Sequence, residues 1–362
     1  FKEIIPLFFI FCFVIISFVL LMSIQSGRKF TVTLDDEGSV WWFGDIFTNG
    51  GYIEKSSIPK RIEDISNVIE ISCGIEFILF VDVEGFAYYK GKLFGKVDPL
   101  TKFETLKDIM HVSSGRHHGV FLDTFGNCFG VGKSIYDSLG MPEEMSNASP
   151  LPKKIIHNAG VIKQIACGDY YTCLLNEDGK VFGCGSNSFK QLSTKYEIGK
   201  GVQEIYYPET IELMSAGSYH LLALSEHGNV WAVGSCSDGK SGIKDQNISS
   251  NGSTTKVNFP EDVVIKALAT AVNHSLAIDS EGNLWTFGKS YVTDKSYRIP
   301  TINPSIQNVL TLCQGGLGGY LLKTQENICV FSNLVDSSRF GVYNIDNEEN
   351  IGIWPYENYH II

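Results

Sequence analysis

The sequence is short of positive charge. Its 29 Lys and Arg residues stand against 40 Asp and Glu residues, which gives a formal net charge of −11, and no basic tail is present. Proteins that hold phosphate backbones do so with clustered Lys and Arg side chains, whose binding releases counterions. We therefore predict that this protein does not bind nucleic acid directly.

The cysteine pattern excludes two further classes. The nine cysteines include no Cys-x-x-Cys pair, which is the usual spacing of structural zinc ligands. Their odd number argues against a complete set of intrachain disulfides. Zinc-dependent and disulfide-stapled folds are therefore not expected.

The sequence also lacks a recognisable catalytic constellation. No nucleophile can be matched with a base and a group that orients it. The acidic pairs at residues 143–144 and 348–349 are expected in solvated loops. We predict no catalytic residue, no cofactor and no metal ligand, and hence a protein that is not an enzyme.

One segment does match a nucleotide-binding pattern. Residues 234–241, Gly-Ser-Cys-Ser-Asp-Gly-Lys-Ser, fit the P-loop motif at every position. That motif works only between a strand and a helix, where backbone amides surround a phosphate. The residues that follow have no apolar helical period, so we predict a loop that binds no nucleotide.

What the sequence does contain is a unit of about 50 residues that occurs seven times. Each unit has a small residue before a Gly, an apolar run, an acidic or polar residue before a second Gly, and an apolar strand ending in Gly. The second glycine recurs every 41 to 54 residues, with Asn327 in the seventh place: Gly38, Gly85, Gly126, Gly179, Gly228 and Gly282. The first glycine recurs, with Ala271 in the sixth unit, at Gly27, Gly74, Gly115, Gly168, Gly217 and Gly315. Such a period indicates an array of small β-units.

Each unit is predicted to form four short strands. An acidic residue before Gly, between two apolar runs, is typical of a tight hairpin because Gly accepts positive φ. Another strand precedes the first glycine, as at residues 161–165, and a fourth is expected at residues 58–62 and 151–156. Four strands in each of seven units predict an all-β protein, a seven-bladed β-propeller.

The unit resembles the regulator of chromosome condensation repeat. The fourth unit is most similar, with Cys-Gly at 167–168, Asp-Gly at 178–179 and Gln-Leu at 191–192. The His of that repeat has counterparts in His118, His220 and His274, with Tyr171 and Phe30 at the same place in units four and one. The terminal Gly-Gln-Leu-Gly is eroded, which makes the chain similar to a divergent member. Kelch propellers are a poorer match because Gly-Gly doublets are few here.

Several recurring side chains are expected in the core. Cysteines at or next to the first glycine are predicted to be buried small residues: Cys73, Cys167 and Cys313. The three repeat histidines are predicted to satisfy backbone groups near the propeller axis. Tryptophans on the third strands are predicted to pack in the core: Trp41, Trp42, Trp231 and Trp285.

The N-terminal segment is strongly hydrophobic. No charged residue occurs from residue 4 through residue 27, and about twenty helical residues span a bilayer. Residues 26–30 nevertheless align with residues 114–118, which makes residues 20–25 the innermost strand of the first unit. The remaining apolar residues would also suit the core of a signal peptide. We expect a hydrophobic segment at 1–24, overlapping blade one, and a propeller at 25–362, located at a membrane or, alternatively, in the cytoplasm.

Propeller loops on rigid blades are suited to protein binding. We predict a protein–protein interaction scaffold, with residues 4–24 as a membrane tether. The candidate partner-facing residues are Arg116, Asp169, Tyr170 and Tyr219. Long loops at residues 136–150, 235–260 and 290–304 would carry specificity, and residues 351–362 are expected to close the ring against blade one.

Two alternative functions remain open. The resemblance implies a guanine-nucleotide exchange factor for a small GTPase, although no residue here can be assigned that role. A secreted propeller that binds or inhibits an enzyme is the other alternative, and it requires cleavage of the N-terminus.

Overall fold

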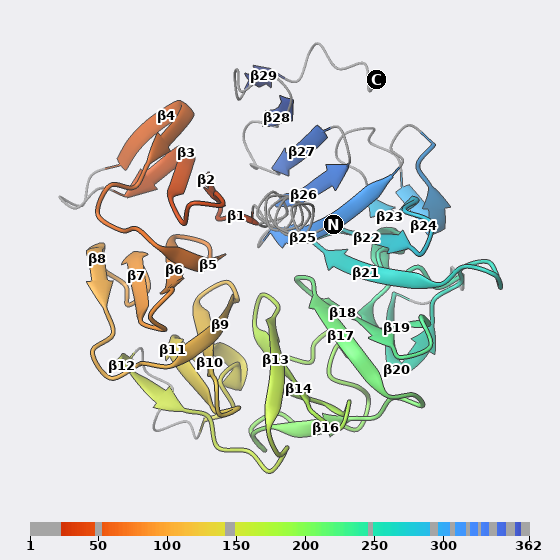
Figure 1. Ribbon diagram of the computed structural model, residues 1–362. Helices are drawn as coiled ribbons and strands as arrows, with labels where there is room; N and C mark the ends of the chain where they lie inside the picture. The colour runs from red at the N-terminus through yellow and green to blue at the C-terminus, as the bar shows by residue number, and fades with distance from the viewer. Residues whose placement is uncertain are drawn as a thin grey trace, which may run out of the picture.

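The computed structural model describes residues 23–47, 53–141, 149–244, 249–289, 296–304, 308–315, 319–324, 327–332, 339–344 and 352–355. Their strands form seven antiparallel sheets that stand around a central axis as the blades of a ring (Figure 1). The prediction of a seven-bladed β-propeller is therefore confirmed.

Six blades have four strands in simple up-and-down order, and the seventh has five. Blades one to three contain β1 (Ser23–Ser26), β2 (Phe30–Leu34), β3 (Val40–Phe47), β4 (Ile53–Arg61), β5 (Val68–Cys73), β6 (Phe77–Asp82), β7 (Ala87–Gly91), β8 (Asp98–Lys102), β9 (Ile109–Ser114), β10 (His118–Asp123), β11 (Cys128–Gly132) and β12 (Ser149–Lys154). Blades four and five contain β13 (Ile162–Cys167), β14 (Tyr171–Asn176), β15 (Val181–Gly185), β16 (Gln203–Ile205), β17 (Ile211–Ala216), β18 (His220–Ser225), β19 (Val230–Ser235) and β20 (Ser250–Lys256). Blades six and seven contain β21 (Ile265–Thr270), β22 (His274–Asp279), β23 (Leu284–Lys289), β24 (Ser296–Ile302), β25 (Val309–Gly315), β26 (Gly319–Thr324), β27 (Asn327–Ser332), β28 (Arg339–Asn344) and β29 (Gly352–Pro355). Two 3₁₀ turns are η1 (Ile135–Asp137) and η3 (Ser237–Gly239).

The second and third strands of each blade are joined by the hairpins that the sequence predicted. Gly179 has φ of +75°, and its amide donates to the carbonyl of Asn176 at 3.1 Å. Four hairpins begin with an Asp whose carboxylate holds the turn. In blade six, Asp279 accepts from the backbone amides of Glu281 and Asn283 and from the indole of Trp285 at 2.8 Å. The same polar residue therefore fixes both the turn and the third-strand side chain.

The core lies between the blades. The second strands β6, β10, β14, β18 and β22 are buried at every residue, because each is covered by a neighbouring blade on both faces. Alternate side chains of a strand point to opposite sides. Thus Tyr171 and Cys173 enter the cluster shared by blades four and five, while Leu174 enters the cluster shared by blades three and four. Each blade is consequently stabilised by its two neighbours.

The predictions of buried cysteines and tryptophans are confirmed at four positions, whereas Trp231 is half-buried and packs against the edge of the core. Cys73 and Cys167 are buried, and both are free thiols; the Cys313 side chain lies outside the described part of the structure. Trp42 and Trp285 are buried. Trp41 is half-buried and, like Trp285, donates its indole N–H to a hairpin carboxylate, here that of Asp35 at 2.8 Å. The added role of such a tryptophan is to anchor the turn.

In unit four the first glycine is required by close packing against its own second strand and the next blade. A Cβ on Gly168 would collide with the ring of Tyr171 and lie 2.6 Å from the carbonyl oxygen of Gly217 in blade five. Because both neighbours are buried, neither can move aside cheaply. We expect Gly168→Ala to lower the free energy of unfolding by about 1–3 kcal/mol, the usual cost of overpacking, measured by urea unfolding. Gly199→Ala reports backbone strain alone, since no atom lies within 4 Å of its added Cβ but its φ is +80°. The packing explanation would be contradicted if Gly168→Ala left the free energy of unfolding unchanged.

Three predictions about segments need correction. The stretches 235–260 and 290–304 are not simply loops, because they contain the outer strands β20 and β24. The described part of the C-terminal tail, β29, pairs with β28 on blade seven rather than with blade one. The ring is closed instead by β1, which contacts β25 and β26 (Figure 1). For residues 352–355 the tail prediction therefore named the wrong blade, and residues 356–362 lie outside the described part of the structure.

The N-terminal prediction is tested only in part. β1 begins at Ser23 and pairs with β2, so the end of the hydrophobic stretch does form the innermost strand of blade one. Residues 1–22, and with them most of the proposed anchor at 4–24, lie outside the described residues. In the part of the chain that is described, no helix has the length and apolar character needed to cross a bilayer.

Candidate functional site

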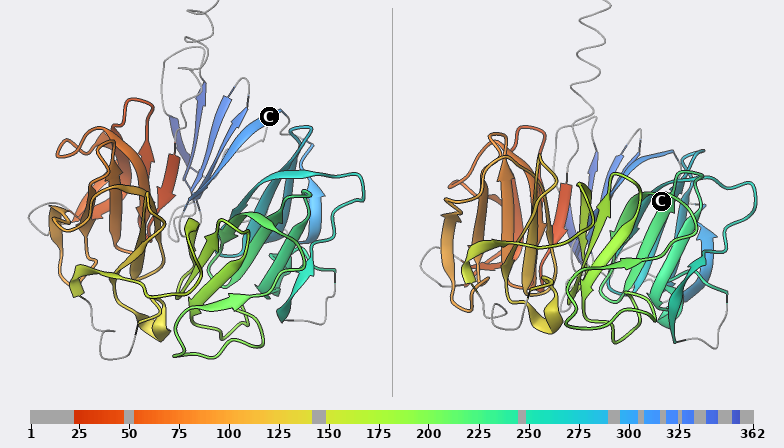
Figure 2. Two further views of the ribbon diagram at one scale, coloured as in Figure 1. Left: turned by 60° about the horizontal axis from the view of Figure 1, so that its bottom comes forward. Right: turned by 90° about the horizontal axis from the view of Figure 1, so that it is seen from below.

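The loops of the propeller emerge at two opposite faces. The side view in Figure 2 shows the strands running between these faces. We call the face that carries the loops after each first and third strand the turn face, because it contains the first glycine of each unit. The opposite face carries the second-to-third-strand hairpins and is called the hairpin face. The four candidate partner-facing residues all follow a first strand and therefore belong to the turn face.

The turn face is held rigid by a chain of backbone hydrogen bonds from blade to blade. The amide of Arg28 donates to Ile75, that of Ile75 to Arg116, that of Arg116 to Asp169, and that of Asp169 to Ser218, at 2.9 to 3.3 Å. Each residue lies directly after the first glycine of its unit. Five successive blades are thus locked in register at this face.

The repeat histidines strengthen the same joints with side chains. His118 Nε2 lies 3.0 Å from the hydroxyl of Thr172 in blade four, and His220 Nε2 lies 2.9 Å from that of Ser275 in blade six. The prediction that they satisfy backbone groups is confirmed in part: His118 also hydrogen-bonds to the backbone of Tyr171, but the Nε2 atoms of His118 and His220 meet hydroxyl groups of the next blade. Burial lowers the pKa of His118 to about 3 and that of His220 well below its usual value. Both imidazoles are neutral structural groups at physiological pH.

The candidate residues come together across blades three, four and five. Arg116 Nη1 lies 3.3 Å from the carboxylate of Asp169. Burial, together with the adjacent Asp169 carboxylate and its hydrogen bond, raises the pKa of Tyr219 to about 12. Asp169 itself is only 4% exposed. It therefore holds Arg116 and Tyr219 in place, whereas the other three side chains reach the surface in part.

Sequence reasoning missed the aromatic residues that complete this surface. Tyr136 is 58% exposed and meets Tyr170 edge to face, with ring centroids 5.7 Å apart. Phe189 is 39% exposed and lies 4.8 Å from the ring of Tyr219. Both aromatics stand four residues after the glycine that ends the third strand, Gly132 and Gly185. This shared repeat position was the signal that could have revealed them. We call Arg116, Tyr136, Tyr170, Phe189 and Tyr219 the aromatic patch.

The segment with the P-loop pattern is part of the blade joint. After β19 the chain makes the single 3₁₀ turn η3, and no α-helix follows in the described residues to 244. Lys240 is 2% exposed, and its ammonium donates to Asn273 Oδ1 at 2.8 Å and to the Val272 carbonyl at 3.3 Å. This lysine binds blade six, and its charge is engaged within the protein.

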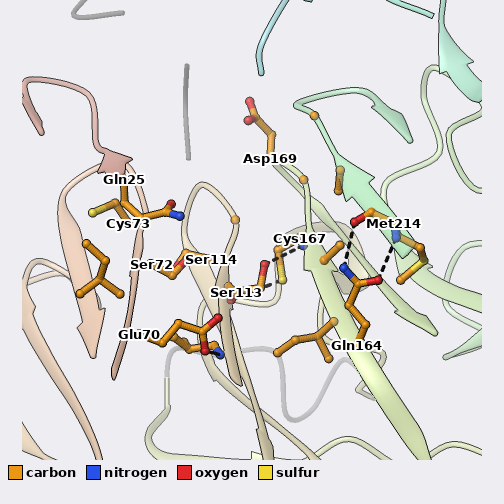
Figure 3. Close-up of a pocket in the computed structure, with 18 of the residues that line it drawn as sticks. Gln25, Glu70, Ser72, Cys73, Ser113, Ser114, Gln164, Cys167, Asp169 and Met214 are labelled. Carbon is orange, nitrogen blue, oxygen red and sulfur yellow. Dashed lines mark hydrogen bonds between the residues drawn. The ribbon is translucent and has the colours of Figure 1, made fainter. Parts of the chain in front are cut away.

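A cavity of about 290 Å³ lies on the propeller axis, lined by the first strands of blades one to five (Figure 3). Its polar side chains mostly join neighbouring strands. Gln164 exchanges two hydrogen bonds with the backbone of Met214, and Glu70 accepts from the amide of Val112 at 2.8 Å. Ser113 accepts from the amide of Cys167. We interpret the cavity as space left between the first strands at the centre of the ring, and not as a ligand site.

Within the described part of the chain, the cavity and its surroundings contain neither a group of metal ligands nor a reactive thiol. No group of three His, Cys, Asp or Glu residues there could hold a metal ion. Burial raises the pKa of the Cys73 thiol well above its usual value and that of Cys167 to about 11. Neutral, buried thiols are poor nucleophiles.

The seven antiparallel sheets of the described residues define a β-propeller. Residues 162–191, which form most of blade four, match the Regulator of chromosome condensation (RCC1) repeat. Together with the similarities described next, this match confirms the predicted resemblance to the RCC1 repeat family, of a divergent kind.

The similarities extend over much of the chain at low identity. It is 21% identical to the Regulator of chromosome condensation of Xenopus laevis, over 74% of this chain and 71% of that protein. It is 29% identical to the Secretion-regulating guanine nucleotide exchange factor of Bos taurus, over 50% of this chain and 41% of that protein. The crystal structure of Prp20p from Saccharomyces cerevisiae has the same fold, with a TM-score of 0.69 at 20% identity over 81% of this chain and 80% of that one. The chain thus spans less than half of the bovine relative.

Proposed function

We propose that this protein is a non-enzymatic protein-interaction scaffold that binds its partner through the aromatic patch of the turn face. The observation that carries the proposal is the arrangement of partly exposed aromatic side chains around Arg116, on loops that are hydrogen-bonded from blade to blade. Tyr and Arg are enriched among residues that dominate protein–protein binding energy. Rigid placement also lowers the entropy lost on binding.

Site-specific photocrosslinking tests the proposal. A benzophenone amino acid replaces Tyr136 on the turn face or, as the matched control, Phe125 on the hairpin face of the same blade, which is 69% exposed. In extract of the source cells, we expect a discrete crosslinked protein from position 136 and none from position 125. Excess unlabelled propeller should compete, whereas a propeller with Tyr170→Ala should compete at least tenfold less well.

Two outcomes would contradict the proposal. Crosslinks of equal yield from both faces would indicate contact without a defined surface. Absence of a competed product from position 136 would mean that the aromatic patch does not bind a protein under these conditions.

Guanine-nucleotide exchange on a small GTPase is the second candidate. Its support comes from two similar proteins: the bovine relative is named as an exchange factor, and Prp20p is described as binding Gsp1p and histones. The measurement is release of fluorescent GDP from a panel of purified small GTPases. Acceleration of GDP release by at least a hundredfold for one GTPase would support exchange activity. If every GTPase in the panel released GDP at its intrinsic rate, the exchange function would be contradicted and the scaffold function would stand.

A further inference from the structure

The two faces of the propeller carry opposite charge. Six hairpin tips are described, at residues 35–38, 82–85, 123–126, 176–179, 225–228 and 279–282. Every one contains at least one Asp or Glu, and none contains Lys or Arg. The hairpin face therefore presents a ring of negative charge.

Cations gather instead on the turn face. Arg28 and Lys29 are exposed in the first turn of blade one, and Arg116 occupies the equivalent turn of blade three. Lys133 follows the third strand of blade three, and its amide donates to the carbonyl of His117 at 2.9 Å, which places it beside the Arg116 turn. Burial and the charges of Arg116 and Lys133 lower the pKa of His117. Two positive charges, those of Arg116 and Lys133, thus act on His117 in this turn.

Three acidic residues near these turns are already paired with cations, and Asp137, beside Tyr136, is half-buried and bonded to backbone groups of Gly201 and Met141. Glu76 lies 3.7 Å from Lys92, Asp45 lies 3.3 Å from Lys55, and Asp169 is buried against Arg116. In contrast, Lys133 is exposed. The cationic turn of blade three directly adjoins Tyr170, because the rings of His117 and Tyr170 lie 6.1 Å apart.

We infer that the aromatic patch and the adjoining Lys133 bind an acidic segment of a partner protein. This inference rests on the proposed function and adds the chemistry of the partner. Arg116 and Lys133 attract the carboxylates, while Tyr136, Tyr170 and Phe189 supply apolar contact. Complementary charge mainly raises the association rate and selects the correct surface. The acidic hairpin face repels the same partner, so binding is directed to one end of the propeller.

A protein segment fits this surface better than a nucleic acid. Single-stranded nucleic acids need aromatic faces open for stacking along a basic groove. Here the planes of Tyr136 and Tyr170 meet at 87°, so the two rings cover each other instead of forming a stacking platform. The net charge of −11 also opposes binding of a polyphosphate.

The test uses a fluorescein-labelled peptide of sixteen residues that alternates Glu-Glu with Leu, and its counterpart with Gln in place of Glu. Fluorescence anisotropy at 50 mM salt should show binding of the acidic peptide only, with a loss of at least tenfold at 300 mM salt, where screening is stronger. Lys133→Glu should weaken binding about fivefold, and Arg116→Glu with Lys133→Glu at least tenfold. The matched control is Glu177→Lys with Asp178→Lys on the exposed hairpin tip of blade four, which should stay within twofold.

Each contrary outcome overturns the inference. These outcomes are no binding of the acidic peptide, equal binding of the Gln peptide, or insensitivity to both turn-face variants. Tighter binding of a single-stranded oligonucleotide than of the acidic peptide would assign the patch to phosphate. Lys133→Glu alone leaves the Arg116–Asp169 pair intact, so its result is independent of any folding defect. If a partner crosslinks at position 136 but binds the Arg116→Glu, Lys133→Glu protein equally well, the proposed function stands and only this inference fails.

Discussion

Acidification from pH 7.5 to pH 5.0 should remove about 6 kcal/mol of folding free energy through three histidines. His118, His220 and His274 are buried, and burial lowers their pKa values, to about 3 for His118 and about 4 for His274. In the unfolded chain each has a pKa of about 6.5. Below pH 6.5 the unfolded chain therefore binds three protons that the buried imidazoles of the folded state do not bind. The folding free energy present above pH 6.5 is lost as the pH falls. Each contributes about 2 kcal/mol at pH 5.0, from about 1.4 kcal/mol per pH unit.

Two partly buried histidines, His117 and His157, add to this slope, because burial is the first cause that lowers their pKa values as well. The pKa of His111 is raised, first by its hydrogen bond to Glu70, so this one histidine acts in the opposite direction. Asp279 has a lowered pKa because Trp285 and Asn283 donate to its carboxylate, and its contribution is lost only below its unfolded pKa near 4. The pH window therefore isolates the histidines.

Urea unfolding at four pH values between 5.0 and 7.5 provides the measurement. His220→Gln keeps a hydrogen-bonding side chain but removes the titration, so about 2 kcal/mol of the loss between pH 7.5 and pH 5.0 should disappear. A protein whose free energy of unfolding is flat across this range would show that the three imidazoles are not held neutral in the fold.

The repeat made much of this fold predictable from local sequence. Gly179 and its equivalents mark hairpins because a positive φ is a local requirement, independent of the rest of the molecule. The second strands were visible as apolar runs because they are covered on both sides. The regular spacing of the repeat glycines then predicted the number of blades, and this prediction needed no knowledge of how the blades pack.

The outer strands were harder because their sequence is not apolar. β20 reads Ser-Asn-Gly-Ser-Thr-Thr-Lys and is a strand only because Trp231 and its neighbours in β19 offer an edge to pair with. The candidate site was predictable only in part for a similar reason. Arg116 and Tyr219 follow repeat glycines, whereas Phe189 reaches Tyr219 from a variable loop. Charge asymmetry likewise emerges only when the topology sends the hairpins and the turns to opposite faces.

One rule of the blade joints can be read only from the structure. At two joints the first side chain of a second strand meets the second side chain of the next blade's second strand. Imidazoles face hydroxyls, as His118 faces Thr172 and His220 faces Ser275. At the joint between blades four and five, Tyr171 occupies the first position and Leu221 is at the hydroxyl position. The phenol of Tyr171 instead donates a bifurcated hydrogen bond to the carbonyls of Gly217 and His220, at 2.9 and 2.7 Å.

Replacing Tyr171 and Leu221 by the His and Thr found at the joint between blades three and four should show strong energetic coupling between the two substitutions. Tyr171→His places a polar ring against buried Leu221 and leaves a cavity, and we expect a loss of about 3–5 kcal/mol in the free energy of unfolding. Leu221→Thr alone buries a hydroxyl without a partner and should cost about 2–3 kcal/mol. In the double variant the imidazole can meet the new hydroxyl, so the combined loss should be smaller than the sum by about 1–2 kcal/mol.

Urea unfolding of the wild type, both single variants and the double variant measures this coupling. Tyr171→Phe is the accompanying control. It keeps the ring, and the His220 carbonyl retains its bond from the Gly217 amide at 2.9 Å, so it should cost only about 1–2 kcal/mol. Strict additivity of the two single losses would show that the imidazole and the hydroxyl do not recognise each other at this joint. Coupling of the expected sign would instead mean that a blade of this propeller is matched to its successor through a single pair of positions. The order of the seven units would then be encoded in their second strands as well as in the connecting chain.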